Sequence, residues 1–385
     1  MKIVNTICVG TGGYGGMMLQ ELFDGAKSDL INLIGVVDPY AEKSPIYNNI
    51  IKAKNIPVYE NISTAFDRVE KSGIKINFVY IATPIQFHTE QIKYSLMRGA
   101  NVLCEKPMTG NVKDLPVLEK FSSTNNFVGI GFQWSFSSAI QRLKKDVMSG
   151  VLGRPEKLKT IVLWPRKTEY FNKTGWKGKM FTVNGEKISD SIVNNAAAHY
   201  IHNMLYILGD CIDSAMGATD IKATLLRAND IETFDSAVVK FKFECGADGL
   251  FVGSHTTDKT IEPKFEYVFE KATVSYNFEN GNIIAEFKDG VKKNYGDPFG
   301  GGATRKINLC AELTANGSVD VLCGIKAAKE HVLFVDKLHS ANKIYNVKQN
   351  LSHLQDGVLV VNGLTEALLE CYDKGTIISD LAEFY

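Results

Sequence analysis

Short apolar runs alternate with helix-patterned segments through the first third of this 385-residue chain. Ile3–Val9 fits a strand buried on both faces, and Tyr14–Phe23 follows it with a helical period. Further strands are predicted at Leu30–Val37, Lys75–Ala82, Asn101–Cys104 and Phe127–Phe132, separated by helices at Asn61–Lys71, Thr89–Arg98 and Lys113–Ser122. Such alternation is typical of a doubly wound parallel sheet, which carries its ligand sites at the carboxyl ends of the strands.

The pattern changes beyond about residue 150. A helix is predicted at about Ser191–Leu208, and Ser236–Glu244 alternates apolar and polar residues as a half-buried antiparallel strand does. Asn280-Gly281 and Asp289-Gly290 are hairpin signals between later short strands. We therefore predict a Rossmann-type α/β domain and an α+β domain with a large, mostly antiparallel open sheet, with boundaries at residues 1–132 and 133–385.

Charge and cysteine content argue against several classes of protein. Forty-three Lys and Arg residues balance 43 Asp and Glu residues, without the basic stripe of a nucleic-acid binder. No apolar window is long enough to span a membrane, and the N-terminal apolar stretch is too short for a secretory signal. The seven cysteines show no C-x-x-C spacing, which argues against a zinc site or disulfide framework. We expect a cytoplasmic protein with no nucleic-acid, membrane or metal partner.

A glycine-rich hexapeptide directly follows the first predicted strand and opens the first predicted helix. Its residues Gly10, Thr11, Gly12, Gly13, Tyr14 and Gly15 fit G-x-G-x-x-G, and this strand–turn–helix context is what gives the short motif its weight. Glycine permits a tight turn, a close backbone approach to a pyrophosphate and close helix–strand packing. The partial positive charge of a helix N-terminus also favours phosphate. We predict a dinucleotide site here.

The residue at the end of the second strand bears on which dinucleotide binds. Asp38 stands 23 positions after Gly15, where a carboxylate can accept hydrogen bonds from both ribose hydroxyls. The same carboxylate repels a 2′-phosphate, and neither Pro39 nor Tyr40 supplies a compensating cation. The sequence therefore favours NAD, with NADP the less favoured cofactor.

Two further strand ends carry polar motifs at the same predicted edge. Ala82, Thr83 and Pro84 follow one strand, with His88 just beyond, and Glu105-Lys106-Pro107 ends the next. We predict that Thr83, Pro84 and His88 wall the nicotinamide pocket, that Ala82 and Glu105 also belong to the cofactor site, and that Lys106 lies beside the nicotinamide and polarises a substrate hydroxyl or carbonyl. The alternative for Lys106 is a strand-end lysine that only extends its charge into solvent.

A polar face is predicted on the helix at residues 191–208. Asn195 and His199 are four positions apart, and small alanines between them leave room for a ligand. Oxidation of an alcohol removes the hydroxyl proton as well as a hydride, and histidine is the side chain best suited to accept that proton near neutral pH. His199 is accordingly the predicted general base, although a buried histidine can also be a core residue.

With these motifs, the chain resembles the glucose–fructose oxidoreductase/inositol dehydrogenase (Gfo/Idh/MocA) family. The resemblance rests on the glycine hexapeptide, Asp38, Ala82-Thr83-Pro84 with His88, Glu105-Lys106-Pro107, His199, and the segment at 149–155 that leads into the second domain. It implies a Rossmann domain plus an open sheet that often forms the oligomer contact, and NAD(P)-linked oxidation of a sugar or cyclitol hydroxyl. The family's lysine and histidine fall on Lys106 and His199.

The chain also departs from the family pattern. The family's aspartate, four positions before the histidine, is Asn195 here, which can orient a hydroxyl but cannot exchange a proton. His199 then lacks a carboxylate to stabilise its charged form, and Asp190 is one candidate to supply it. Ser135 stands where many members have an arginine after the sixth strand.

Substrate contacts are expected from Gln133, after the last strand of the first domain, and from the aromatic stretch at 164–178. Within that stretch Trp164, Arg166 and Trp176 suit the apolar faces and hydroxyls of a sugar, while the alternative is that these aromatics only anchor a long loop. The leading hypothesis is an NAD-dependent oxidoreductase acting on a secondary hydroxyl of a sugar, sugar derivative or cyclitol.

Two alternatives to this activity stay open. One is a glycosidase or lyase that retains NAD and acts by transient oxidation, and the other is a non-enzymatic NAD- or sugar-sensing protein. Because a partly exposed sheet usually needs a partner, a homodimer or homotetramer through the C-terminal sheet is expected.

Overall fold

Two sheets organise the chain, one in each of two compact units. The computed structural model describes residues 2–26, 29–121, 125–172 and 175–385. The first unit comprises Met1–Thr109, Lys113–Ser137 and Gly301–Ala328, and the second comprises Gly110–Val112, Ser138–Gly300 and Lys329–Tyr385. The first unit thus includes a segment from late in the chain, which no sequence pattern indicated. The functional boundaries 1–132 and 133–385 stay a prediction.

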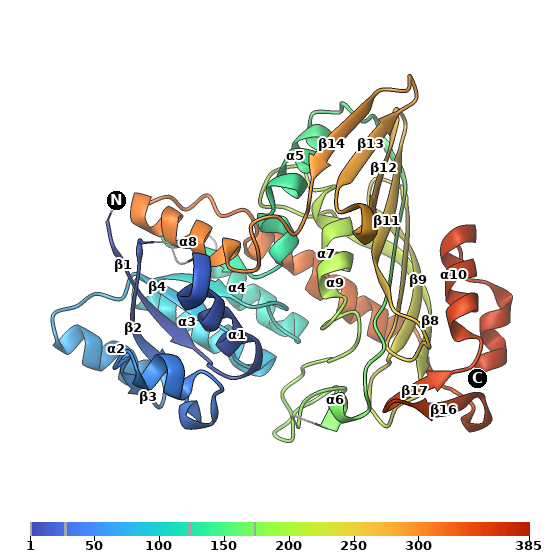
Figure 1. The fold of residues 1–385 in the computed structure, drawn as a ribbon. Helices are drawn as coiled ribbons and strands as arrows, with labels where there is room; N and C mark the ends of the chain where they lie inside the picture. Colours follow the sequence, from blue (N-terminus) through green and yellow to red (C-terminus); the bar gives the residue numbers. More distant parts are fainter. Residues whose placement is uncertain (1, 27–28, 122–124, 173–174) are drawn as a thin grey trace. The chain divides into compact units, whose positions relative to one another are not determined.

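The described strands of the first unit form one parallel sheet in the order β3-β2-β1-β4-β5-β6 (Figure 1). Their bounds are β1 Val4–Val9, β2 Ile31–Val37, β3 Val58–Tyr59, β4 Phe78–Ile81, β5 Asn101–Cys104 and β6 Val128–Ile130. The helices are α1 Gly13–Glu21, α2 Ile62–Lys71, α3 His88–Met97, α4 Leu115–Phe121 and, from the returning segment, α8 Arg305–Asn316. The predicted Rossmann sheet is confirmed. Ser122, the predicted last residue of the fourth helix, lies outside the described residues.

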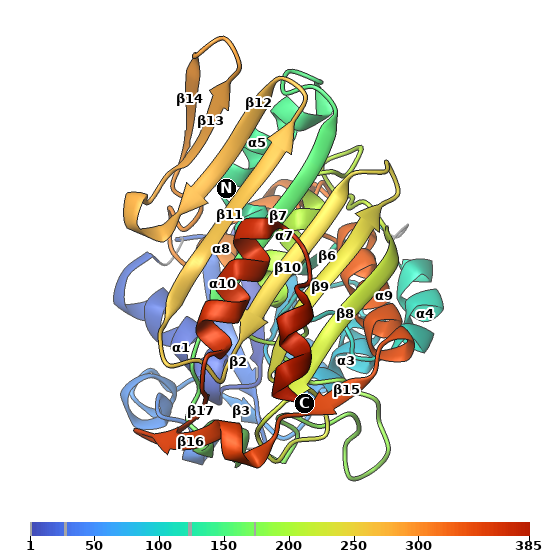
Figure 2. The same cartoon turned by 90° about the vertical axis from the view of Figure 1, so that its right-hand side faces the viewer.

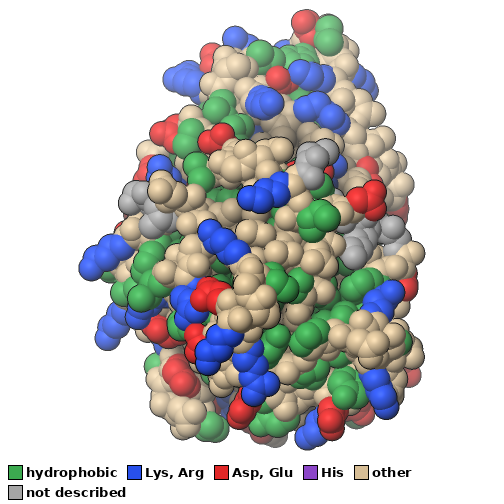
Figure 3. Space-filling view, turned by 90° about the vertical axis from the view of Figure 1, so that its left-hand side faces the viewer, with side chains coloured by type: hydrophobic (Ala, Val, Ile, Leu, Met, Phe, Trp, Pro, Cys, Tyr) green, Lys and Arg blue, Asp and Glu red, His purple; other side chains and the backbone are tan. Residues whose placement is uncertain are grey.

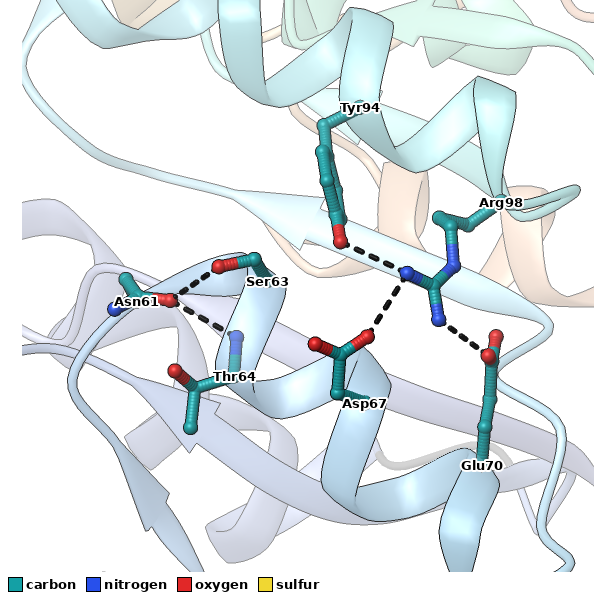
Figure 4. Close-up of polar contacts among 7 residues, drawn as sticks. All are labelled: Asn61, Ser63, Thr64, Asp67, Glu70, Tyr94 and Arg98. Carbon is teal, nitrogen blue, oxygen red and sulfur yellow. Dashed lines mark hydrogen bonds and ion pairs between the residues drawn. The ribbon is translucent and has the colours of Figure 1, made fainter.

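Helix α2 shows why these elements begin where the sequence predicts. The side chain of Asn61 accepts a hydrogen bond from the backbone N–H of Thr64, which caps the helix (Figure 4). Arg98, at the end of α3, reaches back to the carboxylates of Asp67 and Glu70 on α2. This ion-pair network joins two neighbouring helices at the surface of the sheet.

The second unit contains a nine-stranded sheet among its described residues, in the order β14-β13-β12-β11-β7-β10-β9-β8-β15. The strands are β7 Pro155–Leu163, β8 Ala218–Arg227, β9 Ser236–Phe243, β10 Asp248–Ser254, β11 Ile261–Phe269, β12 Ala272–Asn277, β13 Ile283–Phe287, β14 Lys292–Gly296 and β15 Ile344–Asn346. Only the β7–β10 and β8–β15 pairs are parallel within this described sheet. The predicted mostly antiparallel sheet is therefore confirmed, as are turns at both predicted hairpins, where Gly281 and Gly290 have positive φ.

Helices cover both faces of this sheet. They are α5 Ser138–Met148, α6 Glu169–Asn172, α7 Ala198–Tyr206, α9 Ile325–Ala341 and α10 Leu364–Lys374, while β16 Ser352–Gln355 and β17 Val358–Val361 form a separate hairpin. Figures 1 and 2 show α10 crossing one face, with α5, α7 and α9 on the other. Leu364 and Leu368 of α10 pack against Ile161, Leu250 and other buried residues of the strands. Helix α10 thus covers part of that face with residues of the chain itself, and the homo-oligomer stays a prediction.

The helix predicted at about Ser191–Leu208 is wrong at its start. Residues 192–197 form consecutive turns, and regular helix begins at Ala198. Asn194 explains part of this, because its side-chain amide donates to the carbonyls of Ile188 and Ser189 and so holds the chain in a non-helical path. Asn195 therefore lies on the turns before α7, whereas His199 lies in its first turn.

The surface carries mixed charge. On the face shown in Figure 3, Lys and Arg side chains lie beside Asp and Glu side chains and hydrophobic ones. Within the described part of the chain, no helix is long and apolar enough to cross a membrane.

Candidate functional site

The glycine turn, residues 10–15, is shaped by backbone contacts that a side chain would obstruct. Gly10 has a φ of +92°, and a Cβ placed on it would lie 2.7 Å from the carbonyl oxygen of Ala82. A Cβ on Gly15 would lie 2.3 Å from the carbonyl oxygen of Gly10. The turn therefore packs directly against the end of β4, and glycine is required at both positions.

The space in front of the turn is open. Gly12 is the N-cap residue of α1 and makes no side-chain cap hydrogen bond, and a Cβ on it would meet nothing within 4 Å. The helix N-terminus thus faces open space with backbone N–H groups and a favourable dipole. This arrangement fits a diphosphate, as the sequence motif predicted.

Asp38 is bound to the glycine turn. Its Oδ2 accepts hydrogen bonds from the backbone N–H and the hydroxyl of Thr11, at 2.8 and 2.7 Å, and its Oδ1 accepts from the backbone N–H of Tyr40. A carboxylate offers about four lone-pair directions, so these bonds leave acceptor capacity for ribose hydroxyls. The ammonium of Lys43 lies 5.2 Å from the ring centroid of Tyr40, a cation five positions after Asp38 that the sequence argument did not consider.

His88 connects the two loops that follow β4 and β5. It is buried, and its Nε2 and Nδ1 each lie 2.9 Å from a carbonyl oxygen, those of Thr83 and Pro107 respectively. Burial lowers the pKa of His88. A neutral imidazole has one N–H, so His88 donates to one of these carbonyls and only contacts the other. It lies between the Thr83-Pro84 segment and the Glu105-Lys106-Pro107 segment, so both segments, with Lys106, lie at the sheet edge that carries the glycine turn.

A buried charge pair supports this edge. The ammonium of Lys306, on α8, lies 2.6 Å from Oε1 of Glu105, and the same oxygen accepts a hydrogen bond from the hydroxyl of Tyr80 at 2.8 Å. Lys306 Nζ also donates to the hydroxyl of Tyr14 on the glycine turn, at 3.2 Å. Tyr14 in turn donates to Gln133 Oε1 at 3.5 Å.

Within the second unit, Asn195 lies at the centre of a polar cluster. Its Nδ2 donates to Oδ1 of Asp190 at 2.9 Å and to the hydroxyl of Tyr170 at 3.1 Å. Oδ2 of Asp190, a buried carboxylate, accepts from the backbone N–H of Gly178 at 2.6 Å. Tyr170, Asp190 and Asn195 line a small pocket.

His255 and an aromatic cluster lie around the same pocket. His255 is buried, lines the pocket, and its Nδ1 lies 2.8 Å from the carbonyl oxygen of Trp164. A carbonyl only accepts, so Nδ1 carries the proton and Nε2 is left as an acceptor. Burial lowers the pKa of His255 to about 4, so the ring is neutral at pH 7. The Arg166 guanidinium lies over the rings of both Trp164 and Tyr170, at 5.8 and 5.6 Å.

The structure thus brings the predicted residues together in two groups. One group, in the first unit, contains the glycine turn, Asp38, Ala82, Thr83, Pro84, His88, Glu105, Lys106 and Gln133. The other, in the second unit, contains Trp164, Arg166 and Asn195, with His199 joined to Trp164 through the ring of Tyr200. Trp176 is half-buried, and its carbonyl accepts a hydrogen bond from Lys179.

Sequence reasoning missed Lys306 and His255 as site residues. Lys306 lies 201 positions from Glu105, and one lysine among ordinary helix residues gives no signal of such a partner. His255 follows a strand end, which was a usable signal, but the strand itself was not predicted. The loop at 165–187 includes residues 173 and 174, which lie outside the described residues.

A parallel Rossmann sheet with a glycine turn that fits a diphosphate, followed by a large mixed sheet, defines a class of nucleotide-binding oxidoreductases. The sequence model of the oxidoreductase family with an NAD-binding Rossmann fold matches residues 4–132, and that of the GFO/IDH/MocA C-terminal domain matches residues 140–275. The chain belongs to the Gfo/Idh/MocA family, and its first unit carries the NAD-binding Rossmann domain.

Relatives and solved structures agree with this assignment. Myo-inositol 2-dehydrogenase of Thermotoga maritima is 21% identical over 202 residues, 52% of this chain and 56% of the relative. The chain spans about half the length of the first curated relatives it matches. UDP-N-acetylglucosamine 3-dehydrogenase of Acidithiobacillus ferrooxidans superposes with a TM-score of 0.69 at 16% identity, covering 89% of this chain and 98% of that one. Levoglucosan dehydrogenase in complex with NADH superposes with a TM-score of 0.70 at 16% identity, covering 88% and 97%.

Proposed function

We propose that this protein is an NAD-dependent oxidoreductase that transfers hydride between a secondary hydroxyl carbon of a sugar, sugar derivative or cyclitol and nicotinamide. One observation carries the proposal. The glycine turn, the Thr83-Pro84 segment and the loop bearing Lys106 are held at one edge of the parallel sheet, by the Gly10–Ala82 contact and by His88. A diphosphate-binding turn beside a lysine can position a nicotinamide cofactor next to a cation that stabilises charge on the reacting oxygen.

The residues that would hold NAD are those of the first group. Backbone N–H groups at Gly12 and Gly13 would bind the diphosphate, and Asp38 the adenosine ribose. When bound, NAD supplies the hydride acceptor. Thr83, Pro84 and His88 would line the nicotinamide pocket.

Lys106 would act on the reacting oxygen. It is half-buried and directly follows Glu105. Its ammonium would donate a hydrogen bond to the substrate oxygen and stabilise negative charge there as the proton departs. His199, half-buried at the start of α7, would accept that proton as general base.

Asn195 would orient the substrate rather than exchange a proton. Its amide nitrogen donates to Asp190 and Tyr170, which fixes the side chain, and its amide oxygen would accept a hydrogen bond from a substrate hydroxyl. Asp190 therefore acts on Asn195, and we assign it the task of holding that amide. Trp164 and Arg166 would contact the apolar and hydroxyl faces of the ring.

The substrate class draws support from relatives that act on cyclitols and sugars, including the inositol 2-dehydrogenases and levoglucosan dehydrogenase. Tyr170, Asn195 and His255, which line the small pocket, are side chains of the kinds that contact the apolar faces and hydroxyls of a neutral polyhydroxylated ring.

The test is NADH formation over a panel of sugars and cyclitols. Lys106→Met and His199→Ala should each lower kcat by about 10²–10⁴-fold, the usual contribution of general acid–base and charge-stabilising groups. Exposed Lys120→Met and His353→Ala are matched controls that should retain wild-type turnover. Equal turnover in all variants refutes the assigned roles, and glycosidic cleavage without net NADH indicates transient oxidation instead.

A further inference from the structure

We propose that Lys306 is a positioning residue that joins the glycine turn to the Glu105-Lys106-Pro107 loop and so sets the geometry of the nicotinamide half of the site. The inference extends the proposed function, since it concerns how Lys106 is held. It assigns a role to a lysine that lies about 200 positions after this loop, in the segment that returns to the first unit.

Every hydrogen of the Lys306 ammonium has an acceptor. The side chain is fully buried, and Nζ lies 2.6 Å from Glu105 Oε1, 3.2 Å from the Tyr14 hydroxyl and 3.5 Å from the carbonyl oxygen of Gly131. An ammonium has three N–H groups, so these three acceptors use them all. The ion pair and the hydrogen bond to Tyr14 hold the Lys306 pKa above its usual value despite the opposing effect of burial.

Glu105 is confined on its other sides. Its Oε1 also accepts from Tyr80, and its backbone N–H donates to the carbonyl of Ile81. Gly131 closes the remaining side, because a Cβ there would lie 2.8 Å from Glu105 Oε2. The carboxylate is therefore fixed, and with it the backbone from which the next residue, Lys106, projects.

Stability alone does not explain this arrangement. A buried ion pair loses so much hydration that apolar residues of similar size often stabilise a fold equally well. The pair instead joins segments that carry predicted cofactor or substrate contacts: Tyr14 on the glycine turn, Glu105 beside Lys106, and Gln133 through the Tyr14 hydroxyl. Lys306 also cancels the negative charge of Glu105 next to Lys106.

Removing either charge tests this role, because we expect the defects of Lys306→Met and Glu105→Gln to depend on pH in opposite directions. The titratable groups that interact with Glu105 among the described residues are Cys8, Tyr14, Tyr80, His88, Cys104 and Lys306. In Lys306→Met, the buried carboxylate loses its counter-charge, and higher pH favours the charged form that should disrupt the loop. In Glu105→Gln, the buried ammonium loses its partner, and higher pH favours the neutral amine that should relieve the defect.

The readout is the Kd of NADH, measured by fluorescence titration of the full chain from pH 6 to 9. We expect Lys306→Met to weaken binding by about ten-fold at pH 9 and by less at pH 6, with the reverse slope for Glu105→Gln. The double variant Lys306→Met/Glu105→Gln removes both charges and should give a smaller, pH-independent defect. Wild-type affinity should vary little over this range by comparison.

Lys144→Met is the matched control for loss of a buried ammonium. Lys144 is also buried, and its Nζ donates to the carbonyls of Ile212 and Ser214, in a part of the chain remote in sequence from the glycine turn. We expect a lower Tm in this variant without a pH-dependent change in NADH affinity. If Lys306→Met behaves in the same way, or matches the wild type, the positioning role is wrong.

Two further results keep the proposal testable. If Lys306→Met fails to fold, Glu105→Gln alone tests the positioning role. A pH-independent NADH affinity in Glu105→Gln then contradicts the proposal. If the wild type binds NADH but oxidises no polyol, the proposed function fails while the binding series still tests Lys306.

Discussion

The glycine turn and the pocket around Asn195 differ in what fixes their shape. In the turn, backbone meets backbone: glycines at 10 and 15 approach carbonyl oxygens so closely that no side chain fits. In the pocket, side chains from separate segments hold one another, with Asn195 bound to Tyr170 and Asp190. A site that is shaped by backbone contacts tolerates almost no substitution but depends on few residues. A site that is shaped by side chains from several segments depends on many residues, and its shape can be adjusted by substitution. The proposed nucleotide site is thereby kept rigid, while the pocket proposed to contact the substrate is left open to variation.

The first prediction tests whether backbone contacts shape the glycine turn, by adding one methyl group to it. Gly15→Ala places a Cβ 2.3 Å from the carbonyl oxygen of Gly10, so the backbone must move. We expect a loss of about 3 kcal/mol or more in the free energy of unfolding, the upper range for overpacking, together with loss of NADH binding. Urea unfolding and fluorescence titration measure the two effects.

Gly12→Ala is the matched control, since its Cβ would meet no atom within 4 Å. Its unfolding free energy should stay near that of the wild type, while NADH binding weakens because the methyl group occupies the space proposed for the diphosphate. Equal destabilisation by the two substitutions means that the turn is not shaped by the Gly15 contact.

The second prediction concerns acid sensitivity in the pocket. His255 has its pKa lowered to about 4 by burial, against about 6.5 in the unfolded chain, so between these pH values the unfolded state binds more protons. Stability should therefore fall as pH is lowered from 6.5 to 4, by about 3 kcal/mol from this group. His255→Asn retains a donor for the carbonyl of Trp164 and should lose that share of the pH dependence, as measured by urea unfolding at both pH values. An unchanged pH dependence in His255→Asn shows that His255 is already charged or exposed.

The difference between the glycine turn and the pocket around Asn195 also explains which features the sequence could predict. The G-x-G-x-x-G turn, the strand ends at 82 and 104 and the hairpins at 281 and 290 follow from local chemistry, because turn geometry depends on glycine and proline at fixed offsets. Residues such as Lys306 and His255 depend on tertiary contacts across many positions, for which a single sequence carries no periodic signal. The predicted helix start near residue 191 was wrong because the side chain of Asn194 donates hydrogen bonds to two preceding carbonyls. These local side-chain bonds override the helical pattern of the sequence.

The third prediction tests whether the pocket can change without affecting the turn. Both carboxylate oxygens of Asp190 accept a hydrogen bond, one from Gly178 and one from Asn195. Asp190→Asn keeps only one acceptor oxygen and places an NH₂ group against the other donor. We expect about 2 kcal/mol of destabilisation, the range for a lost hydrogen bond to a charged group, with an unchanged NADH affinity. Exposed Asp230→Asn serves as the control. A parallel fall in NADH affinity shows that the two regions are coupled.

The fourth prediction has the smallest expected effect and concerns the preference for NAD over NADP at Asp38, beside the glycine turn. Asp38→Ala removes the carboxylate that repels a 2′-phosphate, and Lys43, whose ammonium lies over the ring of Tyr40, is the cation nearest in the sequence to test for a contact with that phosphate. Because Thr11 also loses its acceptor, both cofactors should bind more weakly. The ratio of NADP to NAD affinity should nevertheless rise about ten-fold, equivalent to about 1.4 kcal/mol. Adding Lys43→Ala should return that ratio toward its original value, since the cation is what attracts the extra phosphate. If the ratio stays high in the double variant, Lys43 has no part in it, and the NAD preference rests on Asp38 alone.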